Sequence, residues 1–290
     1  MAQWAVLSSA QKSASRPPLR VAAVQATSVA GDIDANAATA AAFVRRAGAA
    51  GARLAVFPEK FLTGYEPELV TAQPDRHAVH LGDPRYAPIA DACRENGVAA
   101  VVGTALHDRG RLTISALVIA PTGALAGHYD KQYLFGSERR HFEPGTGGCT
   151  VVLDNWRLGL GICYDSGFPE HARAAAQHDC DAYLVGALFS VGNGHHESRT
   201  WFPARALDNT MYTLMSNHVG AIGGWNACGS SAVWGPDGRL VAEADTTSTT
   251  MVVADLDPGV LRDVRAAHPQ LADYQVTQRA RAHHTLALLT

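Results

Sequence analysis

The feature that most constrains the fold is an alternation of short apolar runs with alanine-rich segments of helical spacing. The run LRVAAVQA, which begins at residue 19, precedes IDANAATAAAFVRRAGAAGA, where apolar side chains recur at helical spacing before a glycine-containing end. WRLGLGICYD and FPEHARAAAQH repeat the pattern, with a proline near the first turn of the second helix. Strands that alternate with helices predict an α/β fold in layers.

Several hairpin signals interrupt this alternation. LTISALVIA runs into the turn PTGA, and SAVWGPDGRLVAEA contains a Pro-Asp-Gly turn. Hairpins join antiparallel strands, so we expect mixed sheets rather than one parallel, doubly wound sheet. Residues 1–18, rich in Ala, Ser and Gln and ending in two prolines, are predicted to be a flexible arm. No linker or tandem repeat follows, which predicts one domain over residues 19–290.

Composition excludes several classes of protein. Hydrophobic residues make up 47% of the chain and charged residues 18%, so a sizeable core is expected. The net charge is -3 and the basic residues are scattered, which argues against nucleic-acid and membrane partners. No apolar run approaches the roughly 20 residues of a membrane span, and the N-terminus lacks a secretory signal pattern. We therefore expect a cytoplasmic protein. Its five cysteines, without a Cys-x-x-Cys pair, are expected to be free thiols that bind no metal.

Three chemically capable residues stand where predicted strands end. Glu59 ends LAVFPE, Lys131 follows GALAGHYD, and Cys163 ends the run LGLGIC. Chemistry in α/β proteins gathers at such junctions. A cysteine thiolate is the strongest nucleophile of the three, a buried glutamate can accept its proton, and a lysine ammonium can stabilise an oxyanion. An activated Cys163 of low pKa, more reactive than the other cysteines, is the corresponding expectation.

Each residue alone has a plainer interpretation. A cysteine after an apolar strand is usually a small buried side chain, a lone lysine is usually a surface charge, and a glutamate can simply cap a loop. Spacing does not decide between these interpretations and catalysis. The residues that flank Glu59, Lys131 and Cys163 distinguish catalytic roles from structural ones.

With those flanks, the sequence resembles the nitrilase superfamily of carbon–nitrogen hydrolases, which use a Glu-Lys-Cys triad. The resemblance extends from about residue 19 to about residue 257. Four motifs occur in the order of the family. One of them, ERRHFEPG, places Glu138 where the family has a second active-site glutamate. The four motifs are FPEKFLTGY around Glu59, YDKQYLF around Lys131, ERRHFEPG beginning at Glu138, and GICYDSGFPE around Cys163; PARALDN, SNHVG and GSSAVWGPDG are further landmarks.

The resemblance implies a four-layer α-β-β-α sandwich whose subunits pair into a homodimer or larger homo-oligomer. It implies catalysis without a metal or an organic cofactor. Glu59 would deprotonate Cys163, and Lys131 with the backbone N–H of Tyr164 would hold the oxyanion. A thioester would form and be hydrolysed by water. Glu138 would orient the substrate or keep Lys131 in place.

The branch of the family is argued from finer features. The short segment between Lys131 and Glu138 and the Cys-Tyr-Asp motif differ from what carbamoylases and nitrilases usually have. PARALDN and SNHVG resemble the branch that acts on small primary amides, which implies hydrolysis of such an amide to a carboxylate and ammonia. An N-carbamoyl amine or a nitrile is the alternative substrate with the same triad, and a non-catalytic binding module on the same fold is a third possibility. A serine hydrolase is disfavoured because no Gly-x-Ser-x-Gly elbow occurs.

The remaining site predictions concern the substrate pocket. Tyr65 is predicted to form part of its wall, Tyr164 to contribute its N–H, and His218 to tune substrate choice. His195 and His196, in the segment 192–199, are predicted to lie in a loop at the pocket entrance. Two adjacent histidines without a third ligand do not predict a metal site.

Overall fold

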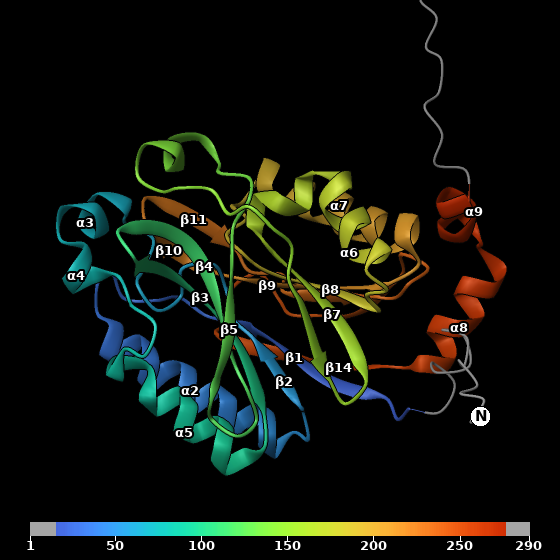
Figure 1. The fold of residues 1–290 in the computed structure, drawn as a ribbon, viewed down its shortest axis with the longest axis horizontal. Helices are drawn as coiled ribbons and strands as arrows, with labels where there is room; N and C mark the ends of the chain where they lie inside the picture. The colour runs from blue at the N-terminus through green and yellow to red at the C-terminus, as the bar shows by residue number, and fades with distance from the viewer. Residues whose placement is uncertain (1–15, 277–290) are drawn as a thin grey trace, which may run out of the picture.

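Two six-stranded sheets packed face to face form the centre of the protein (Figure 1). The computed structural model describes residues 16–276. Helices cover the outer face of each sheet, so the layers follow the order α-β-β-α (Figure 1). The predicted four-layer sandwich is confirmed.

The first sheet mixes parallel and antiparallel pairs. Its order is β14-β1-β2-β3-β4-β5, in which β1, β2 and β3 run parallel and the other neighbours pair antiparallel. The predicted hairpin of LTISALVIA and the turn PTGA is β4 with β5, which pair antiparallel. The strands are β1 (Leu19–Gln25), β2 (Leu54–Val56), β3 (Ala99–Asp108), β4 (Arg111–Ile119), β5 (Leu125–Asp130) and β14 (Thr250–Leu256).

The second sheet has the same plan, with a parallel centre and antiparallel edges. Its order is β13-β12-β9-β8-β7-β6, and β7, β8 and β9 are parallel. A separate hairpin, β10 with β11, follows β9 in the chain. These strands are β6 (Thr150–Leu153), β7 (Trp156–Ile162), β8 (Ala182–Ala187), β9 (Tyr212–Asn217), β10 (Val219–Ile222), β11 (Trp225–Cys228), β12 (Ala232–Trp234) and β13 (Leu240–Glu243).

Helices α2 and α5 lie on the first sheet, and α6 and α7 lie on the second (Figure 1). Local sequence sets their ends. Asp32 caps α2 by accepting the N–H of Ala35, and Gly97 ends α5 in the left-handed conformation. The helices are α2 (Ile33–Ala49), α3 (Pro67–Ala72), α4 (Pro74–His77), α5 (Ala87–Asn96), α6 (Pro169–Gln177), α7 (Asn193–Asn209), α8 (Pro258–Ala267) and α9 (Gln270–Val276).

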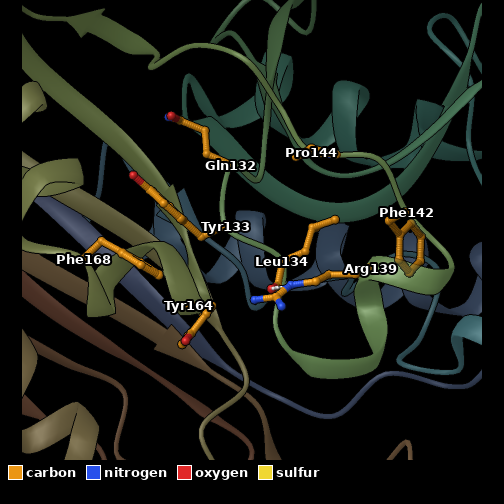
Figure 2. Close-up of a pocket in the computed structure, with 8 residues that line it drawn as sticks. All are labelled: Gln132, Tyr133, Leu134, Arg139, Phe142, Pro144, Tyr164 and Phe168. Carbon is orange, nitrogen blue, oxygen red and sulfur yellow. Dashed lines mark hydrogen bonds between the residues drawn. The ribbon is translucent and has the colours of Figure 1, made fainter.

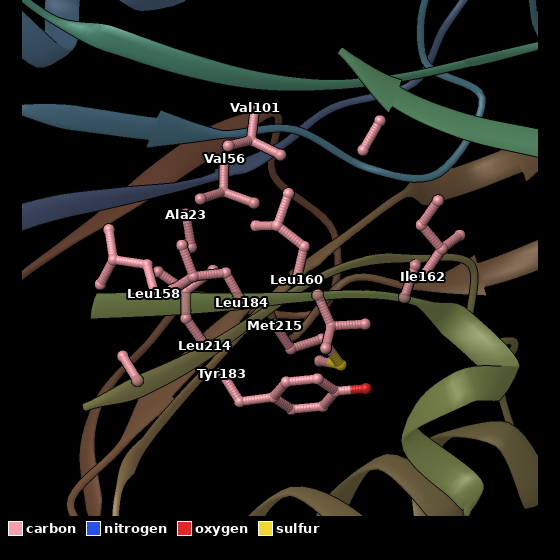
Figure 3. Packing of buried hydrophobic residues seen from close by; sticks show 14 of the residues in the cluster. Ala23, Val56, Val101, Leu158, Leu160, Ile162, Tyr183, Leu184, Leu214 and Met215 are labelled. Atoms are coloured by element: carbon pink, nitrogen blue, oxygen red, sulfur yellow. The ribbon is translucent and has the colours of Figure 1, made fainter. Parts of the chain in front are cut away.

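The main core lies between the two sheets. Val56 and Val101 of the first sheet face Leu160 and Leu184 of the second (Figure 3). A second core lies between the first sheet and its helices α2 and α5. Strand β1 contributes to both cores by alternation, because successive side chains of a strand point to opposite faces.

Helix α7 differs from the prediction. The segment 192–199 was expected to be a loop, but α7 begins at Asn193 and contains both His195 and His196. Gly192, with a φ of 80°, turns the chain into the helix, and the Ser198 hydroxyl donates to the His195 carbonyl in the first turns. The helix also continues through Pro203. The prediction of an entrance loop is therefore wrong.

The predicted flexible arm lies mostly outside the described residues, since these begin at Arg16. The Arg16 side chain is 6% exposed, and its Nη1 atom lies 2.6 Å from Oδ2 of Asp181. Its guanidinium also stacks over the ring of Trp156. Arg265 of α8 binds the other carboxylate oxygen of Asp181 at 3.2 Å. The chain is thus held in place from Arg16 onward. Within residues 16–276, no helix is long and apolar enough to cross a membrane.

Candidate active site

Glu59, Lys131 and Cys163 meet at one end of the sandwich, as their positions after strands predicted. They follow β2, β5 and β7, and the side chains of Glu59 and Lys131 are fully buried. The Nζ atom of Lys131 lies 2.7 Å from Oε1 of Glu59 and 2.7 Å from Oε2 of Glu138. One ammonium group therefore bridges two carboxylates beside the thiol.

Cys163 occupies a strained turn at the end of β7. Its φ is +46°, a left-handed value that non-glycine residues seldom adopt and that occurs frequently at functional sites. A short 3₁₀ helix (Cys163–Gly167) follows, in which the Ser166 hydroxyl donates to the Cys163 carbonyl at 2.7 Å. The thiol donates to the Leu188 carbonyl at 3.6 Å. These two contacts hold the backbone and the sulfur of Cys163 in place.

The environment keeps the Cys163 thiol protonated at rest. Burial raises its pKa most, the Glu59 carboxylate raises it further, and the Lys131 ammonium offsets only part of this. The expectation of a low-pKa thiolate is therefore wrong. Removal of the thiol proton needs an adjacent acceptor, and Glu59 is the carboxylate that exerts the largest effect on the thiol.

Glu138 and Lys131 keep each other charged. Burial opposes ionisation of Glu138, but the ammonium groups of Lys131 and Lys60 outweigh it and hold the pKa of this carboxyl below its usual value. Burial likewise opposes the Lys131 ammonium, yet Glu59 and Glu138 hold the pKa of Lys131 above its usual value. The Phe135 N–H also donates to Glu138 at 2.8 Å. Sequence reasoning did not identify Lys60.

Tyr65 contacts the predicted base directly. Its hydroxyl donates to Oε2 of Glu59 at 2.8 Å, and burial followed by the Glu59 charge raises the pKa of the phenol. Because Lys131 holds the other oxygen of Glu59, both carboxylate oxygens have fixed partners. Tyr65 therefore orients Glu59, beyond the role of pocket wall that was predicted for it.

His218 contacts the backbone of Glu59. Its Nε2 and Nδ1 atoms lie 2.7 Å and 3.0 Å from the carbonyl oxygens of Glu59 and Ala26. Burial lowers the pKa of this imidazole to about 4, so the ring is neutral near pH 7 and donates only one of these hydrogen bonds. With both nitrogens against backbone carbonyls, His218 supports the Glu59 segment. This geometry does not fit the prediction that His218 contacts the substrate.

Two glycines let the Glu59 segment pass between the sheets. A Cβ atom on Gly103 of β3 would lie 2.2 Å from the Pro58 carbonyl oxygen. One on Gly186 of β8 would lie 2.4 Å from the Phe57 carbonyl oxygen. The backbone before Glu59 is thus enclosed from both sheets at distances that exclude any side chain.

Asp165 joins the loop of Lys131 to the turn of Cys163. Its Oδ1 accepts the N–H groups of Gln132 and Tyr133, and its Oδ2 accepts the N–H of Ile162 and the hydroxyl of Tyr129. Asp165 was not among the predicted site residues. These partners are distant in sequence, and the only local signal is the Cys-Tyr-Asp motif itself.

A cavity of about 290 Å³ opens beside the nucleophile turn (Figure 2). Tyr164 and Phe168 line one side of it, and Leu134 and Phe142 line the other. The rings continue as an aromatic row, since Phe135 contacts Tyr164 edge-on and Tyr133 stacks on Phe168. Gln132 and Arg139 add polar groups to its lining. Tyr164 therefore lines the cavity, while the predicted role of its backbone N–H stays a prediction.

The paired histidines gain no metal partners. His195 and His196 lie in the first turns of α7, and the part of the chain that the structure describes contains no group of three or more His, Cys, Asp or Glu suited to a metal ion.

The fold is an α-β-β-α sandwich, and a buried thiol, two carboxylates and an ammonium group lie together at one end of it. The carbon–nitrogen hydrolase family model matches residues 20–266, so the chain belongs to that family. It is an enzyme of the class that acts on non-peptide C–N bonds.

Named relatives include amidases and a nitrilase. The chain is 35% identical to an (R)-stereoselective amidase from a Pseudomonas species, over 76% of this chain and 78% of the relative. It is 31% identical to a nitrilase from Pyrococcus abyssi, over 85% and 93%. An omega-amidase from Homo sapiens is 26% identical, over 81% and 87%.

Solved structures of an amidase from Nesterenkonia sp. AN1 share the fold. A cysteine-to-alanine mutant in complex with butyramide has a TM-score of 0.76 and 29% identity, over 86% of this chain and 95% of that one. A glutamate-to-glutamine mutant, at 28% identity and the same TM-score, shows covalent addition of the acetamide moiety of fluoroacetamide at the active site cysteine.

Proposed function

We propose that the protein hydrolyses a small primary amide to a carboxylate and ammonia through a thioester on Cys163. The observation that carries this proposal is the burial of a thiol beside two carboxylates that one ammonium group bridges. A thiol held protonated in this way needs a base at the moment of attack, and Glu59 is the base beside it.

The steps follow from the contacts. Glu59 accepts the Cys163 proton as the sulfur attacks the amide carbon. The carbonyl oxygen becomes negative and is stabilised by the Lys131 ammonium and the N–H of Tyr164. Glu59 returns the proton to nitrogen, the C–N bond breaks, and ammonia leaves behind a thioester. Water then loses a proton to Glu59, attacks the thioester, and the thiol is restored as the acid leaves.

Tyr65 and Glu138 support these steps without exchanging a proton. Tyr65 fixes one oxygen of Glu59, so the other remains directed towards Lys131 and the thiol. Glu138 fixes Lys131 from the opposite side. Such fixed partners lower the cost of reorganisation when charge moves during the reaction.

The triad residues do not themselves line the cavity, which borders the site through Tyr164, and we infer that the acyl group extends from Cys163 into it. Leu134, Phe142, Tyr164 and Phe168 supply apolar surface, and a volume of about 290 Å³ suits a compact ligand. Arg139 donates its Nε to the Leu134 carbonyl at 3.1 Å, and its guanidinium lies on the cavity side of this contact (Figure 2). A carboxylate at the far end of the acyl chain is therefore a specific alternative to a neutral aliphatic group.

The test is ammonia release from matched substrates. A neutral aliphatic amide, a monoamide of a dicarboxylic acid, an N-carbamoyl amine and a nitrile are compared for the wild type, Cys163→Ala and Cys149→Ala. Cys149 is the matched control because it is a partly exposed free thiol elsewhere in the chain. We expect release from at least one amide by the wild type and Cys149→Ala, and none by Cys163→Ala. Equal release by Cys163→Ala contradicts the mechanism, and release from only the carbamoyl compound or nitrile contradicts the amide assignment.

A further inference from the structure

Lys60 is a buried lysine that none of the steps above uses. It follows Glu59 directly, and its side chain is only 2% exposed. A lysine ammonium is almost never buried to this degree without partners, because removal of its charge from water is costly. Neighbouring groups must therefore offset the cost of burying the Lys60 ammonium.

The partners of Lys60 lie inside the active site. Its Nζ atom lies 3.3 Å from Oε1 of Glu138 and 3.6 Å from the centre of the Tyr65 ring. The ring of Phe142, which lines the cavity, lies 5.4 Å away. Lys60 thus approaches the free oxygen of Glu138, while Lys131 holds the other oxygen.

With Lys60 included, the buried charges of the site balance. Glu59 and Glu138 contribute two negative charges, and Lys131 and Lys60 contribute two positive charges. Without Lys60, the single ammonium of Lys131 would serve two carboxylates in a region sealed from water. Two carboxylates close together resist full ionisation, so one proton would be shared between them. Other titratable groups that interact with this cluster are the Tyr65 phenol, the Cys163 thiol, the neutral His218 imidazole and the Asp165 carboxyl.

We propose that Lys60 is a positioning residue whose ammonium neutralises Glu138 and so leaves Lys131 available to Glu59 and to the oxyanion. This inference rests on the proposed function for its kinetic consequence only. Its electrostatic consequence concerns the carboxylates themselves and can be measured without a substrate.

The kinetic test is the pH dependence of kcat/KM for an amide that the wild type hydrolyses. Lys60→Gln keeps a hydrogen-bond donor but removes the charge, whereas Lys60→Arg keeps the charge. An opposite charge within 4–6 Å typically lowers a carboxyl pKa by roughly 1–3 units. We therefore expect the acid limb of the profile to move about one pH unit or more upward in Lys60→Gln and to stay near the wild-type position in Lys60→Arg.

Arg140→Met is the matched control. It removes one positive charge two residues from Glu138, but the Arg140 side chain is exposed, and its profile should match the wild type. A Lys60→Gln enzyme of lower activity but unchanged acid limb would show that Lys60 only fills space, and the proposal would fail. If Lys60→Gln does not fold, Lys60→Met keeps the apolar stem and replaces it in both tests.

The second test needs no activity. Infrared titration follows the carbonyl band of protonated buried carboxyls, with Glu138→Gln used to assign the band. In Lys60→Gln the band should appear at a pH at least about one unit higher than in the wild type. Coincident titrations overturn the role of Lys60 even if the amide assay succeeds. A shifted titration in an enzyme that releases no ammonia supports Lys60 and rejects the proposed function, so the two failures are distinguishable.

Discussion

The Oδ1 atom of Asp165 accepts a hydrogen bond of 2.9 Å from the backbone N–H of Tyr133. This contact spans the gap between the turn that carries Cys163 and the loop that carries Lys131. Oδ2 of the same carboxylate accepts the N–H of Ile162, the residue before the nucleophile. One buried side chain therefore fixes the distance between the nucleophile and its charge-stabilising lysine.

Asp165→Asn should weaken both loops. An amide has one acceptor oxygen, so either the Ile162 N–H or the Gln132 and Tyr133 N–H groups lose their partner. An unsatisfied buried donor costs about 1–3 kcal/mol. We expect a loss of that size in the free energy of unfolding, measured by urea denaturation, and at least about a tenfold fall in kcat. Asp91→Asn, which alters an exposed ion pair with Arg94, is the control. Wild-type kcat in Asp165→Asn would show that the link between the loops is dispensable.

Glu59→Gln should separate alkylation from hydrolysis. The Glu59 carboxylate raises the pKa of the Cys163 thiol, so its neutralisation makes the thiolate beside Lys131 easier to form. Ammonia departure, in contrast, needs the proton that Glu59 carries, and loss of a general acid–base typically costs about 10²–10⁴ in rate. We expect iodoacetamide still to label Cys163, detected by intact mass, while ammonia release falls by that factor. Labelling that disappears together with activity would contradict this assignment of roles.

His218→Gln should flatten the acid side of the stability curve. The pKa of His218 is about 4 in the folded protein against about 6.5 in the unfolded chain, so the unfolded state binds the extra proton between these values. The stability contributed by the neutral ring is complete above pH 6.5 and is lost as the pH falls towards 4, by roughly 3 kcal/mol in total. Urea denaturation from pH 7 to pH 4 measures this slope for the wild type and the variant. His196→Gln, at an exposed position, is the control, and parallel curves for all three proteins would refute the prediction.

Gly186→Ala should displace the base. The added Cβ would lie 2.4 Å from the Phe57 carbonyl oxygen, so either β8 or the segment that carries Glu59 must move. Overpacking of this kind typically costs about 1–3 kcal/mol, and a shift of the base should lower kcat at least about tenfold. Thermal unfolding and ammonia release measure the two effects. Gly147→Ala, where a Cβ meets no atom within 4 Å, should leave both unchanged. If Gly186→Ala also leaves thermal unfolding and ammonia release unchanged, the sheets accommodate the added Cβ atom and the prediction is wrong.

The layers of the fold follow from short-range signals in the sequence. The period of apolar residues in β1 and α2, and the capping residues beside them, are local properties that a sequence displays directly. Glu59, Lys131 and Cys163 were singled out because each stands where a strand ends, and the motifs that flank them supplied the catalytic interpretation through the family resemblance. The start of α7 was missed because Gly192 and Asn193 resemble a turn, and the hydrogen bonds of the helix override that preference.

The supporting residues of the site could not be found in the same way. Lys60, Asp165 and His218 lie within the quoted motifs, but their roles depend on partners that only the folded chain brings near. His218, for example, contacts Ala26 and Glu59 across both sheets. The predicted pairing of subunits into a homo-oligomer stays a prediction.

Asp181 connects two segments that lie far apart in the sequence. Arg16 and Arg265 bind its two carboxylate oxygens, so the first described residue and the last long helix meet at one side chain. Proteins whose ends lie close together commonly tolerate circular permutation. A variant in which a linker joins the end of α8 to Arg16 and the chain is opened at the exposed turn of Arg109 and Gly110 is expected to form the same four layers. The order of the strands along the chain would change, while every neighbour within the two sheets would stay the same.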